Sequence, residues 1–331
     1  MVNEPLGGMG ISAMFRTLAV SAALVASAAL AAFATTASAQ TLSPAGQAAM
    51  ERQAKGPQPP ADIAGRRAFL DRAQRDGGAR QQRTYAVEVK AAIMAGVPVR
   101  VIRPTAPARP TRRILLNLHG GGFDADSGSM TENIPIAALT GTPVVAVLYR
   151  LGPEHLAPAA LDDALAVYRE LLKTHKPGEI GVYGTSAGAI LGPQLMVRLR
   201  AEHLPMPAVL GVFSGDADLS RNGASSVAMN LDMVTLNRPY LDKISPASPA
   251  ASPLLGELKD FPPTMCLTST GDFFLSSTSN LCRSLDEAGV ENKLVVFDAL
   301  PHAFWAYIAA PESDQAFHAM ARFLKGHLPK R

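Results

Sequence analysis

Short apolar runs that alternate with helical patterns restrict the fold of this chain more than any other feature of its sequence. Six runs are evident, at residues 114–118, 144–148, 180–183, 209–213, 265–267 and 294–297. Apolar residues at helical spacing follow most of them, at residues 159–172, 187–201, 278–288 and 315–324. Apolar strands between amphipathic helices are typical of a parallel sheet covered on both faces. Two alternating segments, 84–89 and 98–102, bring the expected mostly parallel, doubly wound sheet to about eight strands.

The composition supplies material for a large core and argues against a nucleic-acid partner. Hydrophobic residues make up 47% of the 331 residues, and charged residues only 18%. The formal net charge is +3, and the basic cluster at residues 103–113 is interrupted by prolines. Nucleic-acid binders concentrate Lys and Arg on one face. We therefore interpret this cluster as a solvated connection and expect no nucleic acid to bind.

The first 39 residues have the pattern of a secretory signal peptide. Arg16 precedes an apolar stretch at residues 18–34, and a small-x-small cleavage site ends at Ala39. The stretch is short and rich in alanine for a stable membrane anchor. We expect cleavage near Ala39 and export to the periplasm or the medium. No Lys or Arg precedes Met14, which is therefore a second candidate start beside Met1.

Residues 40–331 are expected to form one α/β domain with a small cap. Residues 40–80 begin polar and become helical, while residues 216–263 are rich in Ser and Pro and break the alternation. Insertions in doubly wound sheets lie near the carboxyl ends of the strands, where ligands bind. We therefore expect both segments to contribute to the cap. The two cysteines, Cys266 and Cys282, are expected to be buried free thiols, with a disulfide as the alternative.

The sequence Gly184-Thr185-Ser186-Ala187-Gly188 matches the pattern G-x-S-x-G. The pattern alone is weak, but here it follows an apolar strand and opens a helix, as a nucleophile elbow does. A sharp turn with a strained serine needs neighbours without bulk, and glycine meets that need. The free N–H groups of the helix start would then face an incoming oxygen. The pattern predicts that Ser186 is a nucleophile.

A second glycine-rich element, His119-Gly120-Gly121-Gly122-Phe123, follows the strand expected at 114–118. Three glycines allow the backbone to approach a substrate closely and to aim N–H groups at one point, as a tetrahedral oxyanion requires. Phosphate binding is the rival interpretation. It is disfavoured because neither G-K-[ST] nor G-x-G-x-x-G follows.

A serine nucleophile needs a base, and the base needs a carboxylate to orient it. In this type of fold the chain order is Ser, acid, His. His302 is the best base, because it lies in a loop directly after the strand expected at 294–297. Asp272 is the best acid, because it follows the strand expected at 265–267. Three other acids stay open as lesser candidates, namely Asp298 and, behind it, Asp216 and Asp218.

Four motifs together resemble the hormone-sensitive-lipase-like (bacterial type IV) family of carboxylesterases. They are HGGGF, YRLGPEHLAPAALDDA, GTSAG and PHAF, and the resemblance covers about residues 60–328. It implies the α/β-hydrolase fold with the triad Ser186, Asp272 and His302. It also implies an oxyanion hole made by three backbone N–H groups, those of Gly121, Gly122 and Ala187. His119 would brace the glycine loop, and the second motif would support the site without taking part in the chemistry.

The chain departs from the family pattern at three places. The elbow carries Thr185 where many members have an acidic residue. The usual D-P-L-x-D is Asp272-Phe273-Phe274-Leu275-Ser276, which lacks the second aspartate, and the usual His-Gly-Phe is His302-Ala303-Phe304. None of these changes removes a triad group.

The sequence therefore predicts a serine carboxylesterase that cleaves small or short-acyl esters through an acyl-enzyme. No metal and no cofactor are implied, and the expected partner is a small-molecule ester. A lactonase or an amidase with the same triad is one alternative, and a catalytically silent ligand-binding member of the fold is another. The acyl length, the alcohol portion and the oligomeric state do not follow from the sequence.

Overall fold

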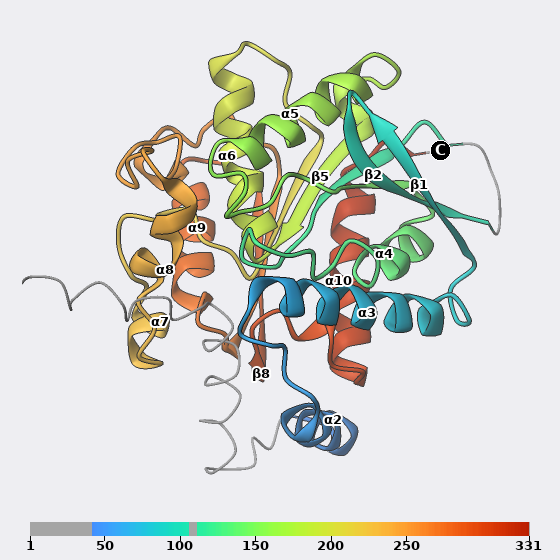
Figure 1. The fold of residues 1–331 in the computed structure, drawn as a ribbon. Helices are drawn as coiled ribbons and strands as arrows, with labels where there is room; N and C mark the ends of the chain where they lie inside the picture. The colour runs from blue at the N-terminus through green and yellow to red at the C-terminus, as the bar shows by residue number, and fades with distance from the viewer. Residues whose placement is uncertain (1–41, 106–110, 331) are drawn as a thin grey trace, which may run out of the picture.

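A computed structural model describes residues 42–105 and 111–330. The predicted signal peptide lies outside these residues. An eight-stranded sheet runs through the molecule in the order β1-β2-β4-β3-β5-β6-β7-β8 (Figure 1). The pairs β1–β2 and β2–β4 are antiparallel, and all other pairs are parallel. The predicted α/β-hydrolase architecture, a mostly parallel doubly wound sheet of about eight strands, is confirmed.

The strands overlap the segments expected from the sequence, although β1 begins three residues later than expected and β8 extends beyond 294–297 at both ends. Their bounds are β1 (Val87–Met94), β2 (Val97–Pro104), β3 (Ile114–Leu118), β4 (Val144–Val147), β5 (Ile180–Thr185), β6 (Val209–Phe213), β7 (Thr264–Gly271) and β8 (Asn292–Pro301). Every residue of β3, β4, β5 and β6 is buried. Central parallel strands are covered on both faces, which explains why these segments are apolar throughout rather than alternating.

Helices cover the sheet on both sides. Their bounds are α2 (Pro44–Lys55), α3 (Ile63–Gln81), α4 (Asn133–Thr140), α5 (Ala159–Leu172), α6 (Ala187–Ala201), α7 (Ala224–Ala228), α8 (Met233–Leu241), α9 (Leu275–Glu287) and α10 (Pro311–Gly326). Buried side chains of α5, α6 and α9 belong to one hydrophobic core with Leu116 and Val182, and those of α4 and α10 belong to a second core with Leu115 and Tyr183. Adjacent residues of one strand thus point into opposite layers.

The register of the two central strands brings the glycine loop and the elbow together. In the parallel pair β3–β5, Leu118 lies opposite Gly184. The residues that follow each strand therefore leave the same edge of the sheet side by side. The start of α6 packs so closely on the end of β3 that a β-carbon on Gly188 would lie 1.8 Å from the Leu118 carbonyl oxygen. Only glycine permits that approach.

The segments expected to form a cap lie at this edge of the sheet. Figure 1 shows α3 running across the lower side of the domain and α7 and α8 beside α9. The ring of Tyr240, in α8, stacks on Phe123 of the glycine loop with centroids 3.7 Å apart. Arg67, in α3, donates hydrogen bonds to the backbone oxygens of Asp124 and Gly152. Both segments thus contact loops of the sheet's carboxyl edge.

Two further features concern expectations from the sequence. Cys266 and Cys282 are buried free thiols that interact with one another, and the Cys282 thiol also donates a hydrogen bond to Asn292. None of the helices described in residues 42–105 and 111–330 is both long and apolar enough to cross a membrane.

Candidate active site

Ser186 lies at the bend between β5 and α6, in a backbone conformation that residues other than glycine rarely adopt. Its φ is 56° and its ψ is −118°. Its N–H donates a hydrogen bond to the Phe213 carbonyl in β6, which fixes the bend from the neighbouring strand. A β-carbon on Gly184 would lie 2.3 Å from the Gly188 oxygen, and one on Gly188 would lie 1.8 Å from the Leu118 oxygen. Both flanking glycines are therefore required. Such strain persists only where the surrounding structure imposes it, and it is found most often at functional sites.

His302 lies within hydrogen-bond distance of Ser186 on one side and of Asp272 on the other. Its Nε2 is 2.9 Å from Ser186 Oγ, and its Nδ1 is 2.8 Å from Asp272 Oδ1. The histidine follows β8, and the Tyr307 hydroxyl donates a hydrogen bond to its carbonyl oxygen at 2.6 Å. Phe273 stacks on the imidazole. The arrangement allows the Ser186 hydroxyl to give its proton to Nε2 while Asp272 accepts a hydrogen bond from Nδ1.

Asp272 is fully buried and held in its charged form. Its Oδ1 also accepts a hydrogen bond from the Phe274 N–H at 2.9 Å, and its Oδ2 accepts one from the Thr268 hydroxyl at 2.9 Å. Burial alone would raise the pKa of this carboxyl, but the charge of His302 and the hydrogen bonds from His302, Ser214 and Phe274 outweigh burial and lower it. An anionic Asp272 fixes the imidazole orientation in which Nδ1 carries the proton.

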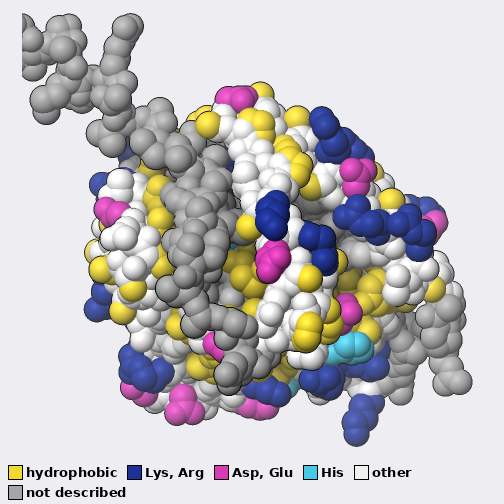
Figure 2. All heavy atoms as spheres, turned by 90° about the horizontal axis from the view of Figure 1, so that it is seen from below, with side chains coloured by type: hydrophobic (Ala, Val, Ile, Leu, Met, Phe, Trp, Pro, Cys, Tyr) yellow, Lys and Arg dark blue, Asp and Glu magenta, His cyan; other side chains and the backbone are white. Residues whose placement is uncertain are grey.

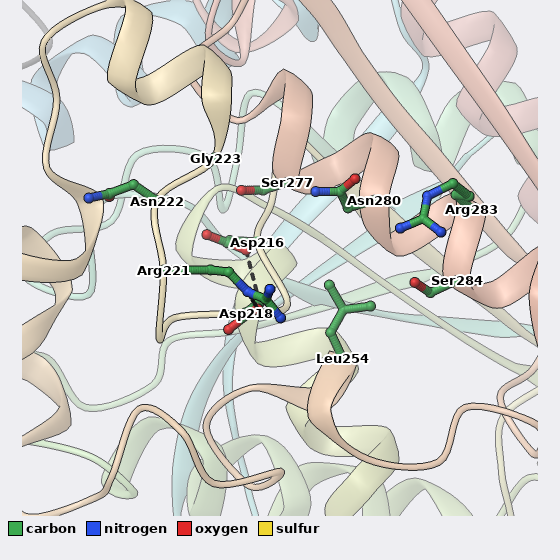
Figure 3. A pocket seen from close by; sticks show the side chains of 10 residues that line it. All are labelled: Asp216, Asp218, Arg221, Asn222, Gly223, Leu254, Ser277, Asn280, Arg283 and Ser284. Carbon is green, nitrogen blue, oxygen red and sulfur yellow. Dashed lines mark hydrogen bonds and ion pairs between the residues drawn. The ribbon is translucent and has the colours of Figure 1, made fainter.

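The other acids considered from the sequence do not occupy this position. Asp298 is exposed and accepts a hydrogen bond from the Thr270 hydroxyl at 2.7 Å. Asp216 and Asp218 line a separate polar cavity of about 170 Å³ between the loop after β6 and α9, where Arg221 forms an ion pair with Asp218 (Figure 3). Burial raises the pKa of Asp216 to about 7. Asp272 alone among the four holds Nδ1 of His302.

The glycine loop turns back on itself next to the elbow. Gly121 and Gly122 have φ values of 121° and 67°, and a β-carbon on Gly121 would lie 2.0 Å from the Ala125 oxygen. A β-carbon on Gly120 would lie 3.3 Å from Ser186 Cβ, which shows how closely loop and nucleophile pack. These positions leave room for backbone alone beside the nucleophile.

Three N–H groups of the glycine loop and the start of α6 lack the backbone hydrogen bonds that most peptide groups make in the part of the chain that the structure describes. In residues 42–105 and 111–330, the N–H groups of Gly121 and Gly122 donate no backbone hydrogen bond. Ala187 is the first residue of α6, so its N–H has no partner within the helix. Groups of this kind next to a serine can bind a developing negative oxygen.

A layer of polar side chains holds the glycine loop from behind. Tyr149 stacks on the His119 ring with centroids 4.1 Å apart, and its hydroxyl donates a hydrogen bond to the His119 carbonyl at 2.6 Å. His119 Nδ1 is 2.8 Å from the Gly120 oxygen. Asp126 accepts hydrogen bonds from the N–H groups of Gly128 and Ser129. The loop is therefore fixed by contacts on the side away from the nucleophile.

Several residues at the site have no signature in the sequence. The Tyr307 hydroxyl, the Ser214 side chain next to Asp272 and the Phe273 ring all support the histidine and its carboxylate. The ion pair between Arg150 and Asp163 joins two parts of the motif at residues 149–164. Phe273 and the pair of Arg150 and Asp163 belong to motifs already singled out, but nothing in those motifs points to these contacts.

The surface near this edge carries charges of both signs. Figure 2 shows hydrophobic side chains gathered in patches across the middle of the face seen from below, among Lys, Arg, Asp and Glu. No large area of positive charge dominates this view.

The chain is similar to a known sequence family and to individual hydrolases. Residues 115–306 match a family described as having the alpha/beta hydrolase fold. An acetyl-hydrolase of Streptomyces hygroscopicus is 33% identical over 234 residues, which cover 66% of this chain and 77% of that protein. An esterase of Acinetobacter venetianus is 28% identical over 253 residues, covering 72% of this chain and 82% of the esterase.

The fold is also similar to solved structures of esterases. The crystal structure of an esterase from the bacterial hormone-sensitive lipase family superposes with a TM-score of 0.72 at 26% sequence identity. The alignment covers 89% of this chain and 100% of that one. The similarity thus extends over nearly all of the part of the chain that the structure describes.

Proposed function

Because this chain belongs to the hormone-sensitive-lipase-like family of α/β-hydrolases, we propose that its carboxylic-ester hydrolase activity proceeds through an acyl-enzyme on Ser186. The observation that carries the proposal is the continuous line from Ser186 Oγ through the His302 ring to Asp272, with separations of 2.9 and 2.8 Å. A nucleophile, a base and an orienting carboxylate at these distances are the set that acyl transfer needs.

The first half of the reaction forms the acyl-enzyme. His302 Nε2 takes the proton of Ser186 as the hydroxyl oxygen attacks the ester carbonyl carbon. The resulting imidazolium is stabilised by the anionic Asp272 at Nδ1. When the tetrahedral intermediate collapses, His302 returns the proton to the departing alcohol, and the acyl group remains on Ser186. Water then repeats the sequence on the acyl-enzyme and releases the acid.

The oxyanion is assigned to the pocket between the glycine loop and the start of α6. Gly121, Gly122 and Ala187 would donate three backbone N–H groups to the negative oxygen of the intermediate. Removing one such donor costs about 3 kcal/mol of transition-state stabilisation in a comparable enzyme. Because the glycine conformations are fixed before substrate binds, little reorganisation accompanies the reaction.

The substrate is proposed to be an ester with a short acyl group. The support is the similarity to an acetyl-hydrolase, together with Phe273 and the cap segments packed close around the site. We further propose that the protein acts outside the cytoplasm, after cleavage of the N-terminal segment near Ala39. N-terminal sequencing of the exported protein tests the cleavage site.

The decisive experiment compares Ser186→Ala with Ser245→Ala on p-nitrophenyl acetate and butyrate. Ser245 is an exposed serine on the loop after α8 and serves as the matched control. We expect S186A to lose turnover and labelling by a fluorophosphonate probe, while S245A keeps both. Substantial turnover by a folded S186A protein would refute the assignment. A series of esters with increasing acyl length then measures the substrate preference.

A further inference from the structure

A buried carboxyl group lies next to the elbow, and no salt bridge to it is seen among residues 42–105 and 111–330. Glu132 is 2% exposed and stands at the N-cap of α4, but its side chain does not cap the helix. The carboxyl turns back toward Gly128, in the segment between the glycine loop and α4, since a β-carbon on Gly128 would lie 2.7 Å from Glu132 Cδ. In the part of the chain that the structure describes, neither carboxyl oxygen has a hydrogen-bond partner, and the Thr185 side chain is a neighbour whose hydroxyl affects the pKa of the carboxyl.

The hydroxyl of Thr185 is the group that could pair with the Glu132 carboxyl. Thr185 is the residue directly before Ser186, it is 2% exposed, and among the described residues its hydroxyl has no hydrogen-bond partner, although the Glu132 carboxyl is its neighbour. Its carbonyl oxygen lies 3.1 Å from the position of a β-carbon on Gly120, so Thr185 touches the glycine loop as well. A carboxyl and a hydroxyl that are both buried and both otherwise unpaired stabilise the fold only by bonding each other.

The surroundings of Glu132 favour its neutral form. Burial raises the pKa of this carboxyl to about 8, the charge of Asp126 raises it further, and the Thr185 hydroxyl lowers it in part. Tyr183, from β5, and Tyr149, after β4, face it with hydroxyl groups whose own pKa values burial raises. On the glycine loop, His119 lies beside Asp126, and Arg100 of β2 lies 3.8 Å from that same aspartate. The guanidinium of Arg100 is thus paired with Asp126 and not with Glu132.

We propose that Glu132 is a positioning residue for ester hydrolysis, which in its neutral form binds the Thr185 hydroxyl and so keeps Ser186 aligned with the oxyanion hole. This inference rests on the proposed function, because it assumes that the hole and the serine work together. Glu132 touches no reacting atom. It acts through Thr185, which precedes the nucleophile and whose carbonyl oxygen packs against Gly120 of the glycine loop.

The proposal predicts how activity depends on pH. When Glu132 loses its proton, a negative charge appears behind the pocket in which the intermediate develops its own negative charge. Like charges in a dry environment repel strongly, so the ionised form stabilises the oxyanion less well. The neutral form is the active one, and kcat falls as the pH rises through about 8. The Thr185 hydroxyl favours ionisation, so its removal moves this fall to higher pH.

The test measures kcat and KM for p-nitrophenyl acetate between pH 6 and 10 in the full-length protein and in three variants. Glu132→Gln keeps the shape but cannot ionise, so we expect activity at pH 7 within about threefold of the parent and no fall near pH 8. Thr185→Val is expected to shift the fall upward. Asp216→Asn is the matched control, because Asp216 is a buried carboxyl with a pKa of about 7 in the separate cavity. We expect D216N to keep the fall.

Each outcome decides the matter. The proposal is overturned if the parent protein shows no fall, if E132Q keeps it, if T185V leaves it unmoved, or if D216N removes it. A purely structural role for Glu132 would change stability or activity at every pH alike and leave the shape of the profile unchanged. An infrared band of a protonated carboxyl, present at pH 7 in the parent and absent in E132Q, gives a check independent of turnover. If the parent neither hydrolyses esters nor labels at Ser186, the proposed function itself fails instead.

Discussion

The ring of Phe273 stacks on the imidazole of His302, with centroids 4.2 Å apart and an angle of 26° between the planes. Phe274 contacts the same imidazole edge-on, with centroids 5.5 Å apart. Two aromatic rings thus cover the base on sides that the hydrogen bonds to Ser186 and Asp272 do not reach. A ring that is fixed in both plane and position holds Nε2 in line with the nucleophile.

Phe273→Ala is therefore expected to lower kcat by about tenfold, because the imidazole gains freedom to tilt away from Ser186. KM should change less, since the change affects the base more than substrate binding. Steady-state kinetics on a short-chain p-nitrophenyl ester measures both constants. Phe323→Ala is the control, because Phe323 packs on His327 in a similar Phe–His pair remote from the site. Equal losses in both variants would contradict a specific role for Phe273.

Asp272→Asn is expected to lower kcat by about 10⁴-fold while the fold stays intact. An amide cannot stabilise the imidazolium, and its NH₂ group favours the wrong tautomer of His302. The matched change Asp298→Asn tests the nearest rival acid in the sequence, which is exposed and hydrogen-bonded to Thr270. It should retain most of the activity. Were D298N the inactive variant and D272N the active one, the assignment of the acid would be wrong.

Gly188→Ala is expected to abolish the folded elbow, because its β-carbon would lie 1.8 Å from the Leu118 carbonyl oxygen. Backbone atoms of a central strand cannot move aside by the amount required. Gly178→Ala is the control, since a β-carbon there meets nothing within 4 Å, and its effect should stay within about 0.5 kcal/mol. Urea denaturation and ester turnover measure the two variants. A stable, active G188A protein would show that the close approach is not needed.

The raised pKa of Asp216 predicts that the free energy of unfolding depends on pH. Its pKa is raised from 3.8 to about 7 in the folded protein, so between these values the folded state holds a proton that the unfolded state has lost. Stability therefore falls as the pH rises from about 4 to 7, by up to about 1.4 kcal/mol per pH unit for this one proton. Asp216→Asn should remove that contribution. Urea denaturation at pH 5 and pH 7 measures it.

The control for this prediction is Asp218→Asn in the same cavity. Hydrogen bonds from Ser220 and Arg221 outweigh burial and lower the pKa of Asp218, so it does not titrate between pH 5 and 7. Because the charge of Asp218 contributes less than burial to the raised pKa of Asp216, the D218N variant should keep most of the parent protein's slope between these two pH values. A D216N protein with an unchanged slope would show that Asp216 is already ionised at neutral pH.

The strands and the elbow were predictable because their information is local. A run such as residues 180–183, followed by G-x-S-x-G, defines a strand, a turn and a helix start within about ten residues. The structure has β5 end at Thr185 and α6 begin at Ala187, with Ser186 between them. The need for glycine at position 184 is also local, because a side chain there would clash with the backbone of Gly188.

Which carboxylate pairs with His302 could not be decided from local sequence. Asp272 follows the strand expected at 265–267 and Asp298 follows the strand expected at 294–297, and sequence order permits either. The structure brings Asp272 to Nδ1 of His302, while Asp298 lies exposed beside Thr270. The pair of Glu132 and Thr185 could not be foreseen at all, because its members lie 53 residues apart and neither has a pattern that points to the other.

The sequence by itself determined the alternation of strands and helices, the tight bend at Ser186 and the glycine loop, because these depend on apolar periodicity and on residues without side chains. Tertiary structure alone decided which carboxylate faces His302 and which buried groups stand behind the nucleophile. Those contacts join loops that are distant in the chain, and their distances are set by the register of β3 on β5 and by the packing of helices on the sheet.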